Sequence, residues 1–311
     1  ADERQVDFLK GIIMAEEKKA VPEAVTCDTA TIKMLHIAQE KGEETIFDRA
    51  VKMKQCNIGT EGICCKICSQ GPCRVPLTKA IKEGAEPDTR KGLCGATPDT
   101  IAARNLVRMI AGGCATHSDH GRGVIETFRA MAYGEAKDYT IKDEIKLREV
   151  AGYFGVSITV QDGDDEAPRD KWDIARDIAD IALGQWGQQQ GRMIYHNRAP
   201  EATKERWIKH GVWPRGIDRE VVEIMHRTHM GVDQDYRNLL KQGARCSLGN
   251  GWGGSMMATV LQDIMFGTPY PNAGNINLGV LSHHKGNSIV HGHDPLLREM
   301  IVAAVHTPDM I

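Results

Sequence analysis

The segment CNIGTEGICCKICSQGPCR (residues 56–74), followed by GLCGAT (residues 92–97), is the most specific signal in the sequence. It holds six of the nine cysteines, between Cys56 and Cys94. Cysteines at this density in a chain without secretory features are typically metal ligands, because a reducing compartment keeps thiols free. The adjacent pair Cys64 and Cys65 cannot be bridged by a disulfide without strain. The segment is therefore predicted to bind metal.

Four of these cysteines form one compact set: Cys65, Cys68, Cys73 and Cys94. The close pair Cys65 and Cys68 lets one turn of backbone present two sulfurs to a single site, and the following Gly-Pro lets the chain bend around it. Four soft thiolates select zinc or an iron-sulfur cluster. Zinc ribbons typically use two pairs of cysteines and would leave Cys56 and Cys64 without a use. The pattern therefore favours an iron-sulfur cluster over structural zinc.

Cys56 and Cys64 supply only half of a second four-cysteine site. In a two-fold symmetric dimer, a residue near the axis meets its own copy, so a second chain would bring the missing two thiolates. The alternative is that both are merely buried thiols. Neither set of cysteines has catalytic ligands beside it in the sequence. Both predicted sites therefore suit electron transfer better than catalysis. The three isolated cysteines are expected to be small buried hydrophobic residues: Cys27, Cys114 and Cys246.

The chain up to about residue 230 has helical periodicity. Apolar spacing predicts helices over residues 28–41, 98–111, 170–185 and 217–230. Thr97 suits the N-cap of the second of these helices, and Pro98 suits its first helical position. Residues 156–160 predict a short strand, and an acidic turn is expected at residues 162–166. The N-terminal part is thus predicted to be mainly α-helical.

Glycine becomes frequent after residue 244, first in SLGNGWGGS (residues 247–255), and a domain boundary is expected there. Near the end, SIV (residues 288–290) predicts a strand, HGHDP a tight turn, and Pro295 the start of a helix. Ligands of open α/β sheets gather at the carboxyl ends of strands, where such a turn lies. The fold expected is a mainly α domain over residues 1–255, then the start of an α/β Rossmann-like domain over residues 256–311, truncated after one helix.

Length and charge restrict the class of protein. With 311 residues, 41% of them hydrophobic, the chain is long enough for two compact globular units. A net charge of -3 indicates neither a nucleic-acid partner nor an anionic membrane surface. No run approaches about 18 apolar residues, so no transmembrane helix is expected. The acidic N-terminal sequence does not resemble a signal peptide, and a cytoplasmic location is expected.

Four stretches resemble one known family, the anaerobic nickel-iron carbon monoxide dehydrogenases, whose fold is related to that of the hybrid-cluster proteins. They are the cysteine segment, GLCGATPDTIAARNLVRMIAGGCATHSDHG (residues 92–121), DIMFGTPYP (residues 263–271) and IVHGHDPLLREM (residues 289–300). The resemblance extends from about residue 30 to the end of the chain. It implies that Cys65, Cys68, Cys73 and Cys94 hold a 4Fe-4S cluster named B. It also implies that Cys56 and Cys64 hold cluster D, shared across a homodimer.

The same resemblance implies a nickel-iron-sulfur cluster C, with His293 as its histidine ligand and His291 as the competing candidate. His117 matches an acid/base group near the nickel, and His120 matches the next member of a histidine series that carries protons outward. In many relatives this histidine series continues at two further positions. This chain has Gly123 and Glu126 there and so departs from the family pattern. The remaining ligands of cluster C would come from sequence beyond residue 311. The pairs His226/His229 and His283/His284 are assigned no role.

The activity implied is oxidation of carbon monoxide with water to carbon dioxide, two protons and two electrons. The electrons would reach a ferredoxin-like acceptor, and an acetyl-CoA synthase subunit is a further candidate partner. One rival is a hydroxylamine reductase of the hybrid-cluster family. A second rival is an electron-transfer or scaffold module without catalysis of its own. The loop at residues 76–92 is longer than the family pattern leads us to expect.

Overall fold

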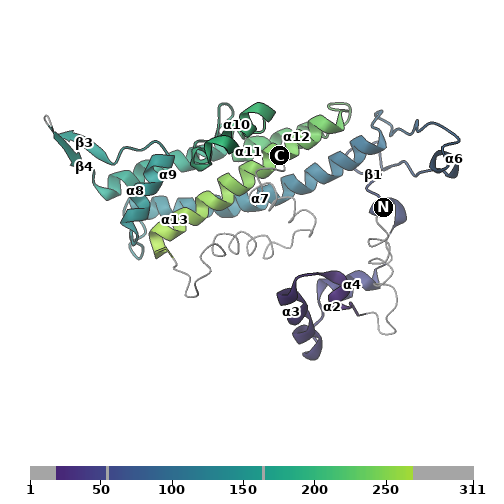
Figure 1. The fold of residues 1–311 in the computed structure, drawn as a ribbon, viewed down its shortest axis with the longest axis horizontal. Coiled ribbons are helices and arrows are strands. Elements are labelled where there is room, and N and C mark those ends of the chain that lie inside the picture. The colour runs from purple at the N-terminus through teal and green to yellow at the C-terminus, as the bar shows by residue number, and fades with distance from the viewer. Residues whose placement is uncertain (1–18, 54–55, 163–164, 269–311) are drawn as a thin grey trace. The chain divides into compact units, whose positions relative to one another are not determined.

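A computed structural model describes residues 19–53, 56–162 and 165–268 of the chain. It separates into two compact units, residues 1–61 and residues 62–311 (Figure 1). The helices and strands of each unit follow from its own sequence and are described in turn.

The first unit is small and helical. Its helices are α2 (Pro22–Val25), α3 (Thr29–Glu40), α4 (Ile46–Lys52) and α5 (Asn57–Thr60). The predicted helix at residues 28–41 is confirmed as α3, with the Asp28 carboxylate accepting from the backbone N–H of Thr31. α3 buries no residue. In a unit with so little core Cys27 lies exposed between α2 and α3, so the expectation that it is buried was wrong.

The second unit is organised around α7 (Pro98–Ala132), a helix of 35 residues that is about 52 Å long. The Thr97 hydroxyl accepts from the backbone N–H of Thr100, and Pro98 opens the helix, as predicted. The helix does not end near residue 111, because buried residues recur along it. The buried apolar side chains that continue this face are Cys114, Ile125, Phe128 and Met131.

Four helices pack against this stripe: α9 (Lys171–Gly187), α11 (Ile217–Arg227), α12 (Tyr236–Leu248) and α13 (Met256–Phe266). α8 (Glu144–Tyr153) packs on α9 and α13 and adds its buried side chains to the same core. The predicted helices at residues 170–185 and 217–230 are confirmed as α9 and α11. Cys114 of α7 and Cys246 of α12 are fully buried in this core, as expected. The 3-10 helix η1 (Ile194–Arg198) and α10 (Glu201–His210) frame a smaller cluster of Trp207 and Trp213.

The glycine-rich sequence at residues 249–255 forms a π-helix, η2 (Gly249–Ser255), that joins α12 to α13. A Cβ added to Gly121 of α7 would lie 2.7 Å from the carbonyl oxygen of Gly254, so the glycines let the two backbones approach closely. The glycine-rich sequence that was expected to mark a domain boundary therefore packs against α7. The second domain expected over residues 256–311 lies mostly outside the described residues and remains a prediction, including its Rossmann-like strand.

The strands are short. β3 (Thr159–Asp162) and β4 (Asp165–Pro168) form an antiparallel hairpin with Val160 opposite Ala167. The strand expected at residues 156–160 thus begins later, and part of the expected acidic turn is a strand, because its residues complete the hairpin. β1 (Cys64–Cys65) and β2 (Cys73–Arg74) form a second hairpin, followed by α6 (Lys79–Lys82). The two hairpins lie toward opposite ends of α7 (Figure 1).

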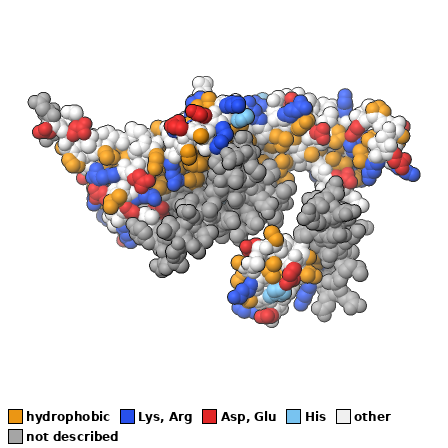
Figure 2. All heavy atoms as spheres, viewed as in Figure 1, with side chains coloured by type: hydrophobic (Ala, Val, Ile, Leu, Met, Phe, Trp, Pro, Cys, Tyr) orange, Lys and Arg blue, Asp and Glu red, His pale blue; other side chains and the backbone are white. Residues whose placement is uncertain are grey.

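The described part of the chain is mostly helical, as predicted. None of the helices among the residues described combines the length and the apolar character needed to cross a membrane. On the face in view, Lys and Arg side chains are interspersed with Asp and Glu (Figure 2).

The close approach of α7 and η2 makes Gly121→Ala destabilising. The new methyl group would overlap the Gly254 carbonyl, so the free energy of unfolding should fall by about 1–3 kcal/mol, measured by chemical denaturation. Gly123→Ala is the matched control, because a Cβ there meets nothing within 4 Å and alanine favours a helix by about 1 kcal/mol. Equal effects of the two substitutions would contradict this account of the packing.

Candidate metal centre

The β1–β2 hairpin positions the first three cysteines of the compact set. Cys65 lies opposite Cys73, and the backbone N–H of Gly71 donates to the carbonyl of Cys68 (3.2 Å). A Cβ at Gly71 would lie 3.1 Å from the nitrogen of Cys73 and 3.3 Å from the carbonyl oxygen of Cys65. Only glycine fits there without a shift, and the tight turn draws the three cysteines together.

Adjacent residues of a strand point to opposite faces. Cys65 therefore points into the hollow beside the hairpin, and Cys64 points to the other face, opposite Arg74 in the register. Asn105 of α7 holds this hairpin by donating to the carbonyls of Gly62 (2.9 Å) and Cys64 (3.1 Å). The two adjacent cysteines therefore lie on different faces of the hairpin, and only Cys65 lines the hollow.

Cys94 reaches the same hollow from the turn before α7. The backbone N–H of Gly92 donates to the Ala96 carbonyl (2.8 Å), and Gly95 adopts a φ of +87°, which favours glycine. The backbone N–H of Leu93 donates to the Cys73 sulfur (3.5 Å). Cys65, Cys68, Cys73 and Cys94 all line one small hollow. The structure thus brings together the four cysteines that the spacing grouped.

Arg104 of α7 also lines this hollow and is 1% exposed. Its guanidinium donates to the Cys94 sulfur (3.5 Å) and to the carbonyl of Asp233 (2.9 Å). Burial acts to raise the pKa of the Cys94 thiol, but the Arg104 guanidinium, the backbone N–H groups of Ala96 and Gly231 and the side chain of Gln234 hold it down to about 7. The donors favour the thiolate, which is the form that binds metal.

A second arginine, Arg108, lies one turn further along α7. Burial lowers the pKa of its guanidinium, and the nearby Cys65 thiol partly opposes this effect. Sequence analysis overlooked both arginines. The signal was present, because Arg104 interrupts the apolar row between Ile101 and Val107 on the buried face of α7, and an arginine there requires a partner in the interior.

The chemistry of the four thiols suits a polynuclear cluster. Four thiolates around a space suit a 4Fe-4S cluster, which takes one cysteine for each iron, whereas a single zinc ion draws its sulfurs to about 2.3 Å from one point. Across the described ranges, no three His, Cys, Asp or Glu side chains meet at one point that would hold a single metal ion. The buried guanidinium of Arg104 adds a cation that an anionic cluster would balance.

The other predicted ligands are placed separately. Cys56 belongs to the first unit, where it precedes α5 and is exposed. Cys64 belongs to the second unit and is half-buried. His293 and His291 lie outside the described residues, so their assignment to cluster C stays a prediction.

His117 lies on the buried side of α7, and its Nδ1 donates to the side-chain oxygen of Asn250 in η2 (2.8 Å). This bond places the imidazole proton on Nδ1 and leaves Nε2 as the basic nitrogen. His120 follows one turn later and is exposed. The two histidines therefore lead from the interior of the unit to its surface. Asn250 was not foreseen, because nothing in a glycine-rich sequence distinguishes one asparagine as a histidine partner.

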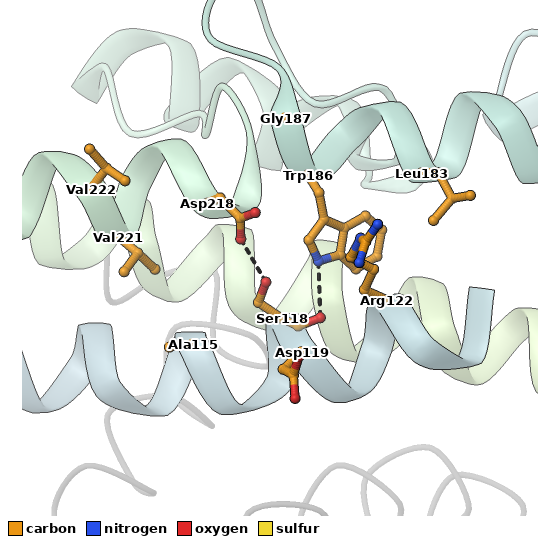
Figure 3. Close-up of a pocket in the computed structure, with 10 residues that line it drawn as sticks. All are labelled: Ala115, Ser118, Asp119, Arg122, Leu183, Trp186, Gly187, Asp218, Val221 and Val222. Carbon is orange, nitrogen blue, oxygen red and sulfur yellow. Dashed lines mark hydrogen bonds between the residues drawn. The ribbon is translucent and has the colours of Figure 1, made fainter. Parts of the chain in front are cut away.

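A shallow groove of about 1230 Å³, including its open mouth, lies between α7, α9 and α11, and His117 is not among the residues that line it. Figure 3 shows the hydroxyl of Ser118 turned toward the carboxylate of Asp218, and the indole of Trp186 turned toward the backbone oxygen of Ser118. These hydrogen bonds measure 2.7 Å and 3.0 Å. Because Ser118, Trp186 and Asp218 bond one another across the groove, we interpret it as part of the packing of three helices.

Comparison with known proteins gives one consistent result. The profile of the Prismane/CO dehydrogenase family matches residues 63–311. Carbon monoxide dehydrogenase 1 of Methanosarcina mazei is 48% identical over 285 residues, which cover 91% of this chain and 43% of that protein. The chain therefore spans less than half the length of this relative.

Two solved structures are similar to the fold. A nickel-free crystal structure of carbon monoxide dehydrogenase from Thermococcus sp. AM4 matches with a TM-score of 0.67 and 42% identity, over 83% of this chain and 39% of that one. A structure of acetyl-CoA synthase/carbon monoxide dehydrogenase matches with a TM-score of 0.68 and 34% identity, over 83% of this chain and 36% of that one.

The lowered pKa of Cys94 leads to a test on the metal-free, reduced chain. Alkylation of Cys94 by iodoacetamide should rise with pH around a midpoint of about 7, because the thiolate is the nucleophile. Arg104→Met removes the donor, so the midpoint should move to higher pH, as read by mass spectrometry of the Cys94 peptide. Arg237→Met, which removes the same charge from an exposed site, should leave it in place. An unchanged midpoint in Arg104→Met would contradict this account of the thiol.

Proposed function

The chain belongs to the Prismane/CO dehydrogenase family, and on that premise we propose that it is the N-terminal part of an anaerobic carbon monoxide dehydrogenase. The reaction proposed for the whole protein is oxidation of carbon monoxide with water to carbon dioxide, two protons and two electrons. The observation that carries the proposal is the set of four cysteines around one hollow at the start of the helix that also bears His117. The relatives named above favour this reaction over hydroxylamine reduction.

Cys65, Cys68, Cys73 and Cys94 would hold a 4Fe-4S cluster, cluster B. Such a cluster accepts and releases single electrons. The chain supplies the thiolates, and Arg104 and the Leu93 backbone donate hydrogen bonds to two of the sulfurs. Apart from the four thiols, which would serve as ligands, the described residues that line this hollow include no His, Asp, Glu or Lys, which supports a role in electron transfer.

Cys56 and Cys64 would hold cluster D together with the same two residues of a second copy, so the protein is proposed to be a homodimer. The assignment of Cys64 and Cys65 to different clusters is supported by the alternation of side chains along β1. It points Cys64 to the face opposite the one to which Cys65 points. Two thiolates from each of two chains make the four that a cluster requires.

His117 is proposed to hold and transfer a proton near cluster C. Its bond to Asn250 fixes the ring and keeps Nε2 basic, and burial limits exchange of that proton with bulk water. His120 would pass the proton toward the surface. His293 is proposed as the histidine ligand of cluster C, the nickel-iron-sulfur site.

Electrons are proposed to leave through clusters B and D to a ferredoxin-like acceptor. The similarity to an acetyl-CoA synthase/carbon monoxide dehydrogenase structure supports an acetyl-CoA synthase subunit as a further partner. A cytoplasmic location is proposed because the cysteines must stay reduced to bind metal.

Anaerobic iron, zinc and sulfide analysis of the purified protein, with EPR spectroscopy, tests the proposal. For this chain we expect about four iron and four sulfide from the compact cysteine set and about two more of each from a shared cluster. Cys64→Ser should remove the iron and sulfide of the shared cluster and leave the four iron and four sulfide of the compact set. One zinc per chain without sulfide would refute the proposal.

His117→Gln tests the proton-transfer role in the complete, metal-loaded enzyme. Loss of a positioned acid/base group should lower kcat by roughly 10²–10⁴-fold while the metal content stays unchanged. His226→Gln on the exposed side of α11 is the control and should keep full activity. Full activity in His117→Gln would rule out this role.

A further inference from the structure

We propose that Arg104 and Gln234 raise the reduction potential of the cluster held by Cys65, Cys68, Cys73 and Cys94, by donating hydrogen bonds to the sulfur of Cys94. The inference rests on the proposed function, since it requires a cluster in this hollow. It assigns a tuning role to two side chains that are not ligands.

Arg104 is held in place without a carboxylate partner. One guanidinium nitrogen lies 3.5 Å from the Cys94 sulfur, and another donates to the Asp233 carbonyl at 2.9 Å. Over the ranges that the structure describes, no ion pair joins Arg104 to an acidic side chain, and the residue is 1% exposed. The sulfur is therefore the anionic group that this buried cation faces.

Gln234 approaches the same sulfur from the segment between α11 and α12. Its side-chain nitrogen donates to the Cys94 carbonyl (2.9 Å) and lies 4.0 Å from the Cys94 sulfur. The backbone carbonyl of Gln234 accepts from the Thr100 hydroxyl (2.6 Å). Residue 234 is thus fixed to α7 and to the turn that carries Cys94.

The segment between α11 and α12 is fixed at its other end as well. The Asp233 carboxylate accepts from Arg227 of α11 (3.1 Å) and from the backbone N–H of Asp235 (3.0 Å). Arg108 of α7 donates to the Thr228 hydroxyl (2.8 Å). These bonds hold the donors at fixed places beside the sulfur, and a preorganised donor does not have to reorient when the charge of the cluster changes.

Addition of one electron makes a cluster more negative by one charge. Hydrogen bonds to its sulfurs and a nearby cation both stabilise the more negative form, so they raise the reduction potential. Arg104 supplies both effects and Gln234 only the hydrogen bond. A higher potential would make this cluster a better acceptor of the electrons that carbon monoxide oxidation releases.

The test is an anaerobic titration of the cluster-loaded protein with dithionite and mediators, followed by EPR. In this chain, a Cys64→Ser background removes the shared cluster, so the remaining signal is that of the cluster held by Cys65, Cys68, Cys73 and Cys94. We expect the midpoint to move to more negative potential in Gln234→Met, and further in Arg104→Met. Arg104→Lys keeps the charge without the planar guanidinium and should shift less than Arg104→Met. Arg237→Met is the control for loss of a nearby exposed charge and should leave the midpoint unchanged.

Unchanged midpoints in both Gln234→Met and Arg104→Met, at full iron and sulfide content, would overturn the inference and leave the proposed function intact. Where Arg104→Met fails to assemble a cluster, Gln234→Met alone decides. A parent protein that binds no iron and sulfide would instead refute the proposed function on which the inference rests.

Discussion

The second unit depends on the burial of one long helix. α7 presents an apolar stripe over most of its 35 residues, and α9, α11, α12, α13 and η2 cover that stripe and remove it from water. The cysteine hairpin, the segment between α11 and α12, and η2 are each held by a side chain or backbone of this helix. A change in the packing of α7 would therefore affect the candidate metal centre and His117 together.

Buried polar contacts decide how the covering segments are oriented. Arg215 pairs with Glu220, which is fully buried on α11, and Gln242 of α12 donates to the same carboxylate (2.7 Å). A buried carboxylate without such partners is strongly destabilising, so the network fixes α11 and α12 relative to each other. The segment that carries Asp233 and Gln234 is thereby fixed at both ends.

The proposed routes for electrons and protons use different parts of α7. The thiols gather just before its first turn, whereas His117 lies roughly 28 Å further along the helix axis. His120 is exposed, and Gly123 and Glu126 stand where a longer histidine series would continue. Separation along a single rigid helix keeps the two routes at fixed positions while leaving them chemically independent.

The sequence by itself determined α3, α9, α11 and the start of α7 with its N-cap at Thr97, and it grouped the four cysteines, because periodicity, capping and ligand spacing are local properties of the chain. It did not predict α8, α10, α12 or α13, nor the length of α7. It did not reveal that the glycines at residues 249–255 serve close packing on α7, since a glycine-rich run is equally typical of a loop. Only the tertiary structure decided that Arg104 faces Cys94, that Asn250 meets His117 and that Cys64 and Cys65 turn to different faces. These contacts join residues far apart in the chain or depend on the pairing of strands, and no local pattern encodes which partner a buried polar group will find.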